Sequence, residues 1–218
     1  MTRYGSAHTL ETVRKLLLGL ALAVTLALPS SAAANHSWNG WHWAKTSSSR
    51  TLVISDGVSG DWDTVFPGVR SDWNASLTGT GVSLALGSSG VNITTQSKSW
   101  GNNGWLGLAQ VWIKGGHITR ASVKLNDYYD WYYPAATRLQ GKQQVFCQEV
   151  GHTLGLDHQD APATCMSDSN DLRTTPYPHP NAHDGAELRS LYDHVDSSGR
   201  GAAHERGPFT IHVVPAHL

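Results

Sequence analysis

The chain is poor in charge and in sulfur-containing residues. Charged residues make up only 15% of its 218 positions, and 16 Lys and Arg against 17 Asp and Glu leave a formal net charge of −1. It has only two cysteines and two methionines, one of which is the initiator, and no internal repeat is present. Because domains that bind nucleic acid carry a basic face, we expect no nucleic-acid partner.

The main apolar run lies near the N-terminus and is short. It covers residues 16–28, follows the basic pair Arg14 and Lys15, and precedes three alanines at 32–34. A membrane-spanning helix needs roughly 20 apolar residues, whereas a secretory signal combines a basic start, a short apolar run and a small-residue cleavage site. We interpret residues 1–34 as a signal peptide, with a membrane anchor as the alternative. The mature protein is then expected to be secreted and extracellular, with no stable membrane anchor.

Strand and helix patterns are mixed along the remainder of the chain. We expect strands at 51–54, 82–86, 91–94, 105–113 and 117–125, and helices at 61–77, 135–153 and 184–195. Pro67 interrupts the first helical pattern, so that helix is expected to begin there, and Asp184 with Glu187 has the spacing of a capping box. The pattern predicts one monomeric α+β domain over residues 35–198. Residues 199–218 have no clear period and are expected to form a loose C-terminal tail.

One stretch in the second half of the chain has the spacing of a metal site. Gln148 and His152 are four residues apart, so on a helix their side chains lie on one face and can reach the same ion. Glu149 is rotated from them by about 100°, close enough to hold a water molecule bound to that ion. Gly155 accepts the left-handed conformation that ends a helix, and His158 can then return as a third ligand. Three protein ligands with an open fourth position are typical of a catalytic zinc site.

This stretch, with Met166 downstream in the sequence Ala-Thr-Cys-Met-Ser, resembles the metzincin clan of zinc endopeptidases, and matrixin-like secreted members in particular. The resemblance implies that His152 and His158 bind Zn2+ and that Glu149 is the general base that takes a proton from zinc-bound water. It also implies that Met166 lies in a tight turn beneath the zinc. The expected fold is a twisted mixed sheet with an active-site helix, this methionine turn and a C-terminal helix. The expected partner is a protein or peptide substrate.

Gln148 stands where this clan has its first zinc-binding histidine. A carboxamide oxygen is a harder and weaker zinc ligand than a neutral imidazole. Three interpretations stay open: Gln148 binds zinc weakly, a nearby side chain or water replaces it, or the site is degenerate. Secreted bacterial members with Gln-Glu-x-Gly-His favour the first, a zinc-dependent endopeptidase, whereas the last gives a non-catalytic secreted protein that binds peptide or glycan. Asp157 is the alternative to His158 as third ligand.

The two cysteines, Cys147 and Cys165, are expected to form a disulfide because the chain carries an export signal. Such a bond would join the active-site helix to the methionine turn. Two buried free thiols, or a thiolate as third zinc ligand, are the alternatives. No cysteine lies between the signal and the first strand, so we expect no latency through a cysteine that caps the zinc.

The resemblance carries two further expectations. The strand at 105–113 is expected to be an edge strand above the active-site helix, where it would pair with an extended substrate. The turn-rich loop 99–104 is a candidate for structural Ca2+ bound through backbone and amide oxygens. We interpret the aromatic segment 38–43 as packing onto the domain. His117 is expected to be an ordinary strand residue, and three later histidines are expected on the surface or in packing: His179, His183 and His194.

Overall fold

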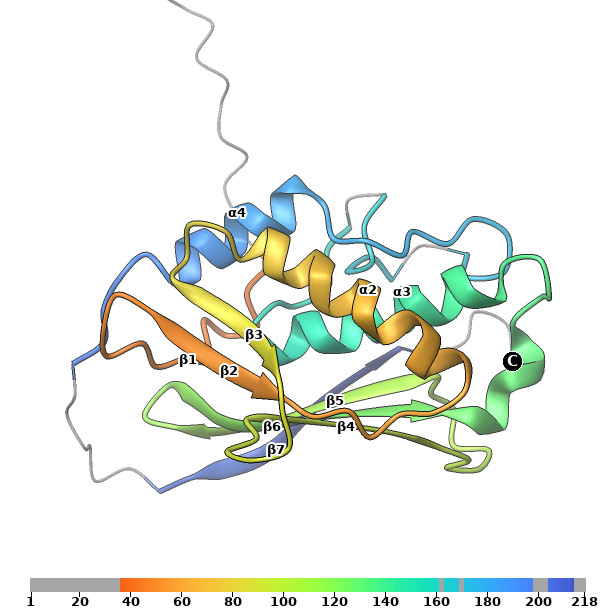
Figure 1. Cartoon of the computed structure of the whole chain (residues 1–218), viewed down its shortest axis with the longest axis horizontal. Helices are drawn as coiled ribbons and strands as arrows, with labels where there is room; N and C mark the ends of the chain where they lie inside the picture. The colour runs from red at the N-terminus through yellow and green to blue at the C-terminus, as the bar shows by residue number, and fades with distance from the viewer. Residues whose placement is uncertain (1–35, 161–162, 169–170, 198–203, 214–218) are drawn as a thin grey trace, which may run out of the picture. The chain divides into compact units, whose positions relative to one another are not determined.

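Among the residues that the structure describes, seven strands form one mixed sheet (Figure 1). The structure is a computed structural model and describes residues 36–160, 163–168, 171–197 and 204–213. The predicted signal peptide lies outside these residues. The strands are β1 His42–Trp43, β2 Arg50–Ile54, β3 Val82–Leu86, β4 Ile93–Lys98, β5 Gly107–Lys114, β6 His117–Asn126 and β7 Arg206–Val213.

The sheet has a parallel part and an antiparallel part. The order of the strands is β3-β2-β4-β6-β5-β7, with β1 paired in addition to β6. Every pairing among β1, β2, β3, β4 and β6 is parallel. Strand β5 is antiparallel to both β6 and β7. The predicted strands at 51–54, 82–86 and 117–125 are confirmed as β2, β3 and β6.

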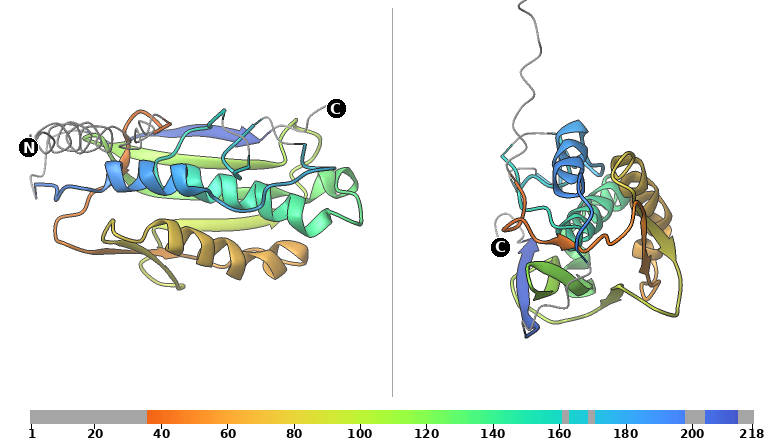
Figure 2. Two further views of the ribbon diagram at one scale, coloured as in Figure 1. Left: turned by 90° about the horizontal axis from the view of Figure 1, so that it is seen from above. Right: turned by 90° about the vertical axis from the view of Figure 1, so that its left-hand side faces the viewer.

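The helices lie on one face of this sheet, as Figure 1 shows. They are α2 Asp61–Ser76, α3 Arg138–Thr153 and α4 Ala182–Leu191, with a short 3-10 segment η1 Asp127–Tyr132 before α3. Figure 2 shows the strong twist of the sheet and the helices gathered on its concave side. The chain is therefore an α+β protein, as predicted. No helix among the described residues is long and apolar enough to cross a membrane.

Helix α2 differs from the prediction in where it begins. It starts at Asp61 and contains Pro67, although we expected Pro67 to open it. An interior proline costs a helix roughly 3 kcal/mol, but the turn before it buries Trp62 and Phe66, and Phe66 stacks on Phe146 of α3 with ring centroids 5.3 Å apart. Burial of these aromatic side chains offsets the cost of the proline.

The other two helices also begin at positions other than those expected. Helix α3 starts at Arg138, three residues after the expected start at 135, because residues 135–137 form a turn instead. Helix α4 is capped by Asn181 and Asp184, whose side chains each accept a backbone N–H, rather than by Asp184 and Glu187. The cap is one helical turn earlier than predicted because an asparagine at the N-cap serves as well as an aspartate.

The aromatic N-terminal segment packs on the domain, as predicted. Trp38 and Trp43 are buried, and Trp43 belongs to β1, which pairs with the start of β6. The indole Nε1 of Trp43 donates to the carbonyl oxygen of Thr153 at 2.8 Å. That carbonyl belongs to the last residue of α3, so the segment satisfies one of the acceptors that a helix C-terminus leaves free.

The prediction of a loose tail is wrong for residues 206–213, which form β7. This strand pairs antiparallel with β5, from Gly107 opposite Val213 to Ile113 opposite Arg206. Only its second half alternates between covered and exposed side chains, and a glycine and a proline stand near its start. Such a short alternation is a weak strand signal, and the pairing with β5 supplies what local sequence does not show.

Candidate functional site

Helix α3 holds three of the predicted site residues. Gln148, Glu149 and His152 are all buried in its last two turns. The helix ends at Thr153, and the chain reverses at Gly155, whose φ is 102°. A Cβ at this position would lie 2.1 Å from the carbonyl oxygen of Trp41. Position 155 therefore requires glycine both for its backbone angle and for this close approach.

The reversal brings His158 back to His152. Their Nε2 atoms are 3.0 Å apart. The Nδ1 of His152 lies 2.9 Å from the carbonyl oxygen of Leu156, and the Nδ1 of His158 lies 2.7 Å from Oδ2 of Asp168. These acceptors hold the ring protons on the Nδ1 atoms, so the two Nε2 lone pairs face the same point, as in metal-binding histidines.

The spacing of the two imidazoles and the charge state of His152 fit a metal ion. Two nitrogens bound tetrahedrally at 2.0–2.1 Å from zinc are roughly 3.3 Å apart, close to the 3.0 Å between these Nε2 atoms. Burial and, to a smaller extent, the neighbouring His158 lower the pKa of His152 to about 3, against the opposing effect of the bond to Leu156. His152 is therefore neutral at pH 7, which is the form that binds metals.

Asp168 is a site residue that sequence analysis missed. Its Oδ1 accepts from the side-chain amide of Gln148 at 3.0 Å, while its Oδ2 faces His158. Burial alone would raise the pKa of Asp168, but the hydrogen bonds from His158 and Gln148 hold it below the usual value. One carboxylate thus orients two of the three candidate ligands. It turns the Gln148 nitrogen toward itself, so the amide oxygen is on the opposite side.

Glu149 is fully buried beside β5 and β7. Its Oε1 accepts from the backbone N–H of Val213 at 3.3 Å, and no donor among the described residues reaches its Oε2. Burial raises the pKa of this carboxyl well above its usual value, and the bond from Val213 opposes that shift in part. Gly107 of β5 makes room for it, because a Cβ there would lie 2.7 Å from Oε1.

The expectation that β5 is an edge strand is wrong. Strand β7 pairs along it, with Ala109 opposite Ile211 and Val111 opposite Phe209. The ring of Phe209 also packs on Trp41, with centroids 4.5 Å apart. The strand edge at which we expected a substrate is therefore covered by a segment of the chain itself.

The cysteines form the predicted disulfide, and Met166 lies next to α3. Cys147 and Cys165 are bonded, with S–S 2.02 Å. Met166 is fully buried, and its Sδ lies 2.4 Å from the place where Gly151 would carry a Cβ. Met166, the residue after Cys165, thus packs against α3 at Gly151, which is the residue before His152.

The alternative ligand Asp157 is engaged elsewhere. Its Oδ1 accepts from the backbone N–H of His158 at 2.8 Å, and its own N–H donates to the carbonyl oxygen of His36 at 2.6 Å. Asp157 thereby holds the turn that presents His158. The structure brings His158, and not Asp157, within hydrogen-bonding distance of His152.

The loop proposed for calcium is organised by a buried amide. The side-chain nitrogen of Asn126 donates to the carbonyl oxygens of Gly101 and Trp105 and to Oδ1 of Asn103, at 2.9–3.2 Å. Its oxygen accepts from the N–H groups of Trp100 and Tyr128. Three oxygens of this segment therefore already accept from a donor, and calcium at this loop stays a prediction.

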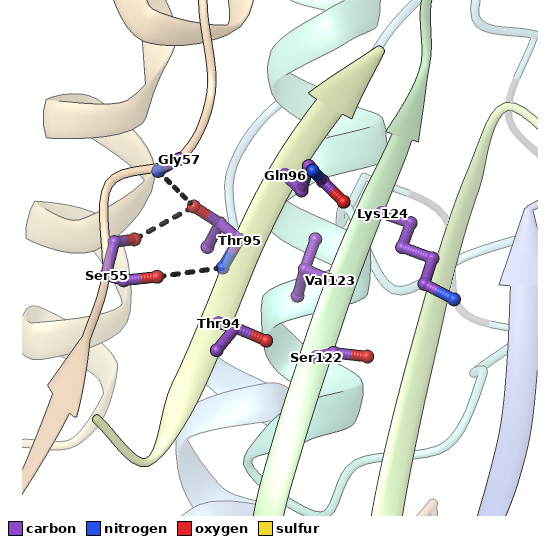
Figure 3. Close-up of a pocket in the computed structure, with 8 residues that line it drawn as sticks. All are labelled: Ser55, Gly57, Thr94, Thr95, Gln96, Ser122, Val123 and Lys124. Atoms are coloured by element: carbon purple, nitrogen blue, oxygen red, sulfur yellow. Dashed lines mark hydrogen bonds between the residues drawn. The ribbon is translucent and has the colours of Figure 1, made fainter. Parts of the chain in front are cut away.

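A hollow elsewhere on the sheet offers little chemistry. It has a volume of about 350 Å³ and lies over β4 and β6 (Figure 3). Two of its lining residues are already hydrogen-bonded to each other: the hydroxyl of Ser55 accepts from the backbone N–H of Thr95, and the hydroxyl of Thr95 donates to the carbonyl oxygen of Ser55. Its described lining contains no histidine, cysteine or carboxylate, so it lacks the side chains that commonly bind zinc.

Comparison with known proteins gives no family assignment: no family model matches the chain, and no curated protein matches it. The resemblance to metzincins therefore rests on the motif from Gln148 to His158 and on Met166.

Proposed function

We propose that the protein is a secreted zinc-dependent endopeptidase. The observation that carries the proposal is the pair of Nε2 atoms of His152 and His158, 3.0 Å apart, with both outer nitrogens fixed by acceptors. His152, His158 and the amide oxygen of Gln148 would hold the zinc, and Asp168 orients the last two. The donor set of two neutral imidazoles and one amide suits zinc less well than three imidazoles, so a lower affinity is expected.

The chemistry divides between the metal and Glu149. Zinc bound there would polarise the scissile carbonyl and make a bound water more acidic. Glu149 accepts a proton from the attacking water on Oε2, the oxygen that no described donor reaches. It then returns that proton to the leaving amine.

Substrate access requires β7 to move. Extended peptides bind protease clefts by adding a strand to a sheet edge, and here the edge of β5 is paired with β7. The backbone N–H of Val213 also donates a hydrogen bond to Oε1 of Glu149. The described arrangement is accordingly the closed form of the proposed enzyme, and cleavage takes place when residues 206–213 leave β5.

Two measurements test the proposal. Zinc content after dialysis is expected to be lower in His158→Ala than in the wild type, whereas His179→Ala, which changes an exposed histidine paired with Asp72, should match the wild type. Casein cleavage is expected to rise in Phe209→Ala, which loosens β7, and to disappear when Glu149→Gln is added. Equal zinc in all three proteins would reject the site, and equal cleavage with and without Glu149→Gln would reject the mechanism.

The second candidate is a non-catalytic protein that binds peptide or glycan on the same fold. The complete burial of Glu149 and its bond to β7 favour it, because a general base must reach the water that it deprotonates. It predicts that neither the wild type nor Phe209→Ala cleaves casein.

A further inference from the structure

Four side chains converge where β1, the start of β6 and the segment after α4 meet. The parallel pairing of β1 with β6 places His42 opposite His117. Asp196 reaches them from the segment after α4, and one ligand atom from each of these three residues lies within 4.8 Å of the other two. His194 faces the same point, with its Nε2 3.2 Å from the Nε2 of His42. All three histidines were expected to be strand, surface or packing residues, or were not singled out.

A single carboxylate oxygen stands at the centre of this group. Oδ1 of Asp196 is 2.9 Å from the Nε2 of His117, 3.1 Å from that of His194 and 3.4 Å from that of His42. The carboxylate is itself fixed to Lys45, whose backbone N–H donates to Oδ2 and whose carbonyl accepts from the N–H of Asp196 at 2.8 Å. The position of Oδ1 is therefore set by the backbone.

The ring protons of two of the histidines are drawn away from the centre. The Nδ1 of His42 lies 3.0 Å from the carbonyl oxygen of Gly40, and the Nδ1 of His194 lies 3.3 Å from Oδ1 of Asp193. With the protons on Nδ1, both Nε2 atoms present lone pairs to one another and to the Asp196 carboxylate. Three electron-rich atoms that face one point repel each other unless a cation or a shared proton lies between them. Protonating both rings instead would place two N–H groups face to face across 3.2 Å.

The distances between donors fit a zinc ion. Bonds of 2.0–2.1 Å in a tetrahedral site put neighbouring ligand atoms roughly 3.3 Å apart. The three nitrogens lie 2.9, 3.1 and 3.4 Å from Oδ1 of Asp196, the Nε2 atoms of His42 and His194 are 3.2 Å apart, and His117 offers a ligand atom within 4.8 Å of His42. Three imidazoles and one carboxylate are ligands that suit zinc, whereas calcium and magnesium prefer sites made of oxygen. The acceptors at Gly40 and Asp193 correspond to the outer partners that orient metal-bound histidines.

We propose that His42, His117, His194 and Asp196 form a second zinc site, separate from the motif on α3. Four protein ligands close the coordination shell, which is typical of a structural and not a catalytic site. The ion would join β1, the start of β6 and the segment that follows α4. The proposal does not depend on endopeptidase activity, because it uses none of the residues of the motif.

The test uses the full chain and measures zinc per folded protein after dialysis against a weak chelator. The variants are His194→Ala at the new site, His158→Ala at the motif, and the two combined. His194 is 47% exposed, so its removal leaves no buried cavity. We expect His194→Ala to lose about one zinc per chain whether or not His158 is present, and zinc added to the apoprotein to raise the melting temperature of the wild type more than that of His194→Ala.

A second, conservative variant distinguishes the loss of the zinc site from a change in folding. Asp196→Asn keeps the side-chain size and an oxygen for the N–H of Lys45, and it replaces the oxygen that faces the histidines, with its negative charge, by an NH2 group. Weaker zinc binding in Asp196→Asn with unchanged circular dichroism supports the site. If both His194→Ala and Asp196→Asn retain all the zinc of the wild type, the group is an ion-pair network and the proposal is overturned. Loss of zinc in His158→Ala alone would leave the proposed function standing and reject this site.

Discussion

Asp168 shows how far one side chain can determine the motif site. One of its carboxylate oxygens accepts a hydrogen bond from Gln148 and the other contacts His158. Asp168 therefore orients both of these candidate ligands. The motif itself could be predicted because Gln148, Glu149, His152 and His158 are close in sequence and one helix followed by one glycine turn determines their geometry. Asp168 could not, because its position depends on the fold of the loop that follows the turn.

Asp168→Asn is expected to weaken zinc binding at the motif by about 10- to 100-fold, the range found for outer partners of metal ligands. An asparagine has one acceptor oxygen, so it cannot serve both Gln148 and His158. Competition with a chromophoric chelator measures the dissociation constant. Asp171→Asn is the matched control, since the Asp171 carboxylate accepts hydrogen bonds from nearby Arg173 and Thr174. Equal affinities for the two variants would show that Asp168 orients nothing.

Gly155→Ala is expected to destabilise the fold by about 2–4 kcal/mol, because alanine is strained at positive φ and its Cβ would meet the carbonyl of Trp41. Gly101→Ala separates the two causes: Gly101 has φ 83° but nothing within 4 Å of its Cβ position. It should cost only about 1–2 kcal/mol. Urea unfolding gives both values, and similar losses would mean that the contact with Trp41 is unimportant.

At the scale of elements, the strands with clear alternation were predictable and their neighbours were not. Strands β2, β3 and β6 follow from their own sequence, but the place of β5 between β6 and β7 depends on a segment about 100 positions away. The short alternation of β7 gave no local signal. For the same reason His42, His117 and Asp196 could not be grouped: strand pairing and the segment after α4 bring them together.

A disulfide between β5 and β7 tests whether β7 controls access. Gln110 and Thr210 are register partners with side chains 3.4 Å apart, and opposite residues in antiparallel strands are close enough for a disulfide. Oxidised Gln110→Cys/Thr210→Cys is expected to cleave casein about tenfold more slowly than the same protein after mild reduction, because the lock lowers the fraction in the open form.

The wild type treated with the same reductant is the control for this lock, since its own disulfide is buried. If the locked and reduced forms cleave at the same rate, β7 does not cover the substrate-binding edge.

At the scale of the whole molecule, strand pairing and one disulfide hold the elements together. The α+β class followed from the pattern of strands and helices, but the order of the sheet required contacts that no local pattern contains. The bond between Cys147 and Cys165, 18 residues apart, ties α3 to the segment that carries Met166. The expectation of export alone predicted this bond, since cysteines in secreted proteins are commonly paired.

Replacing both cysteines with alanine is expected to lower the free energy of unfolding by roughly 3 kcal/mol, the loop-entropy value for a ring of this length. Urea unfolding of the variant measures the loss. Wild type unfolded under reducing conditions opens the same ring without changing a side chain, so it should lose a similar amount. A much smaller loss in the reduced wild type would assign the effect to the alanines.

The contact between Trp41 and Phe209 gives the molecule an optical reporter of its own. Trp41 is partly buried and packs on β7 through Phe209, while neighbouring Trp38 lies edge-on to His152 with centroids 6.2 Å apart. Departure of β7 would expose the Trp41 indole to water and shift its emission to longer wavelength, and an ion on His152 would alter the emission of Trp38. Opening of the strand and loading of the metal can thus be followed separately in one cuvette, without any attached dye, by comparing Trp41→Phe with Trp38→Phe.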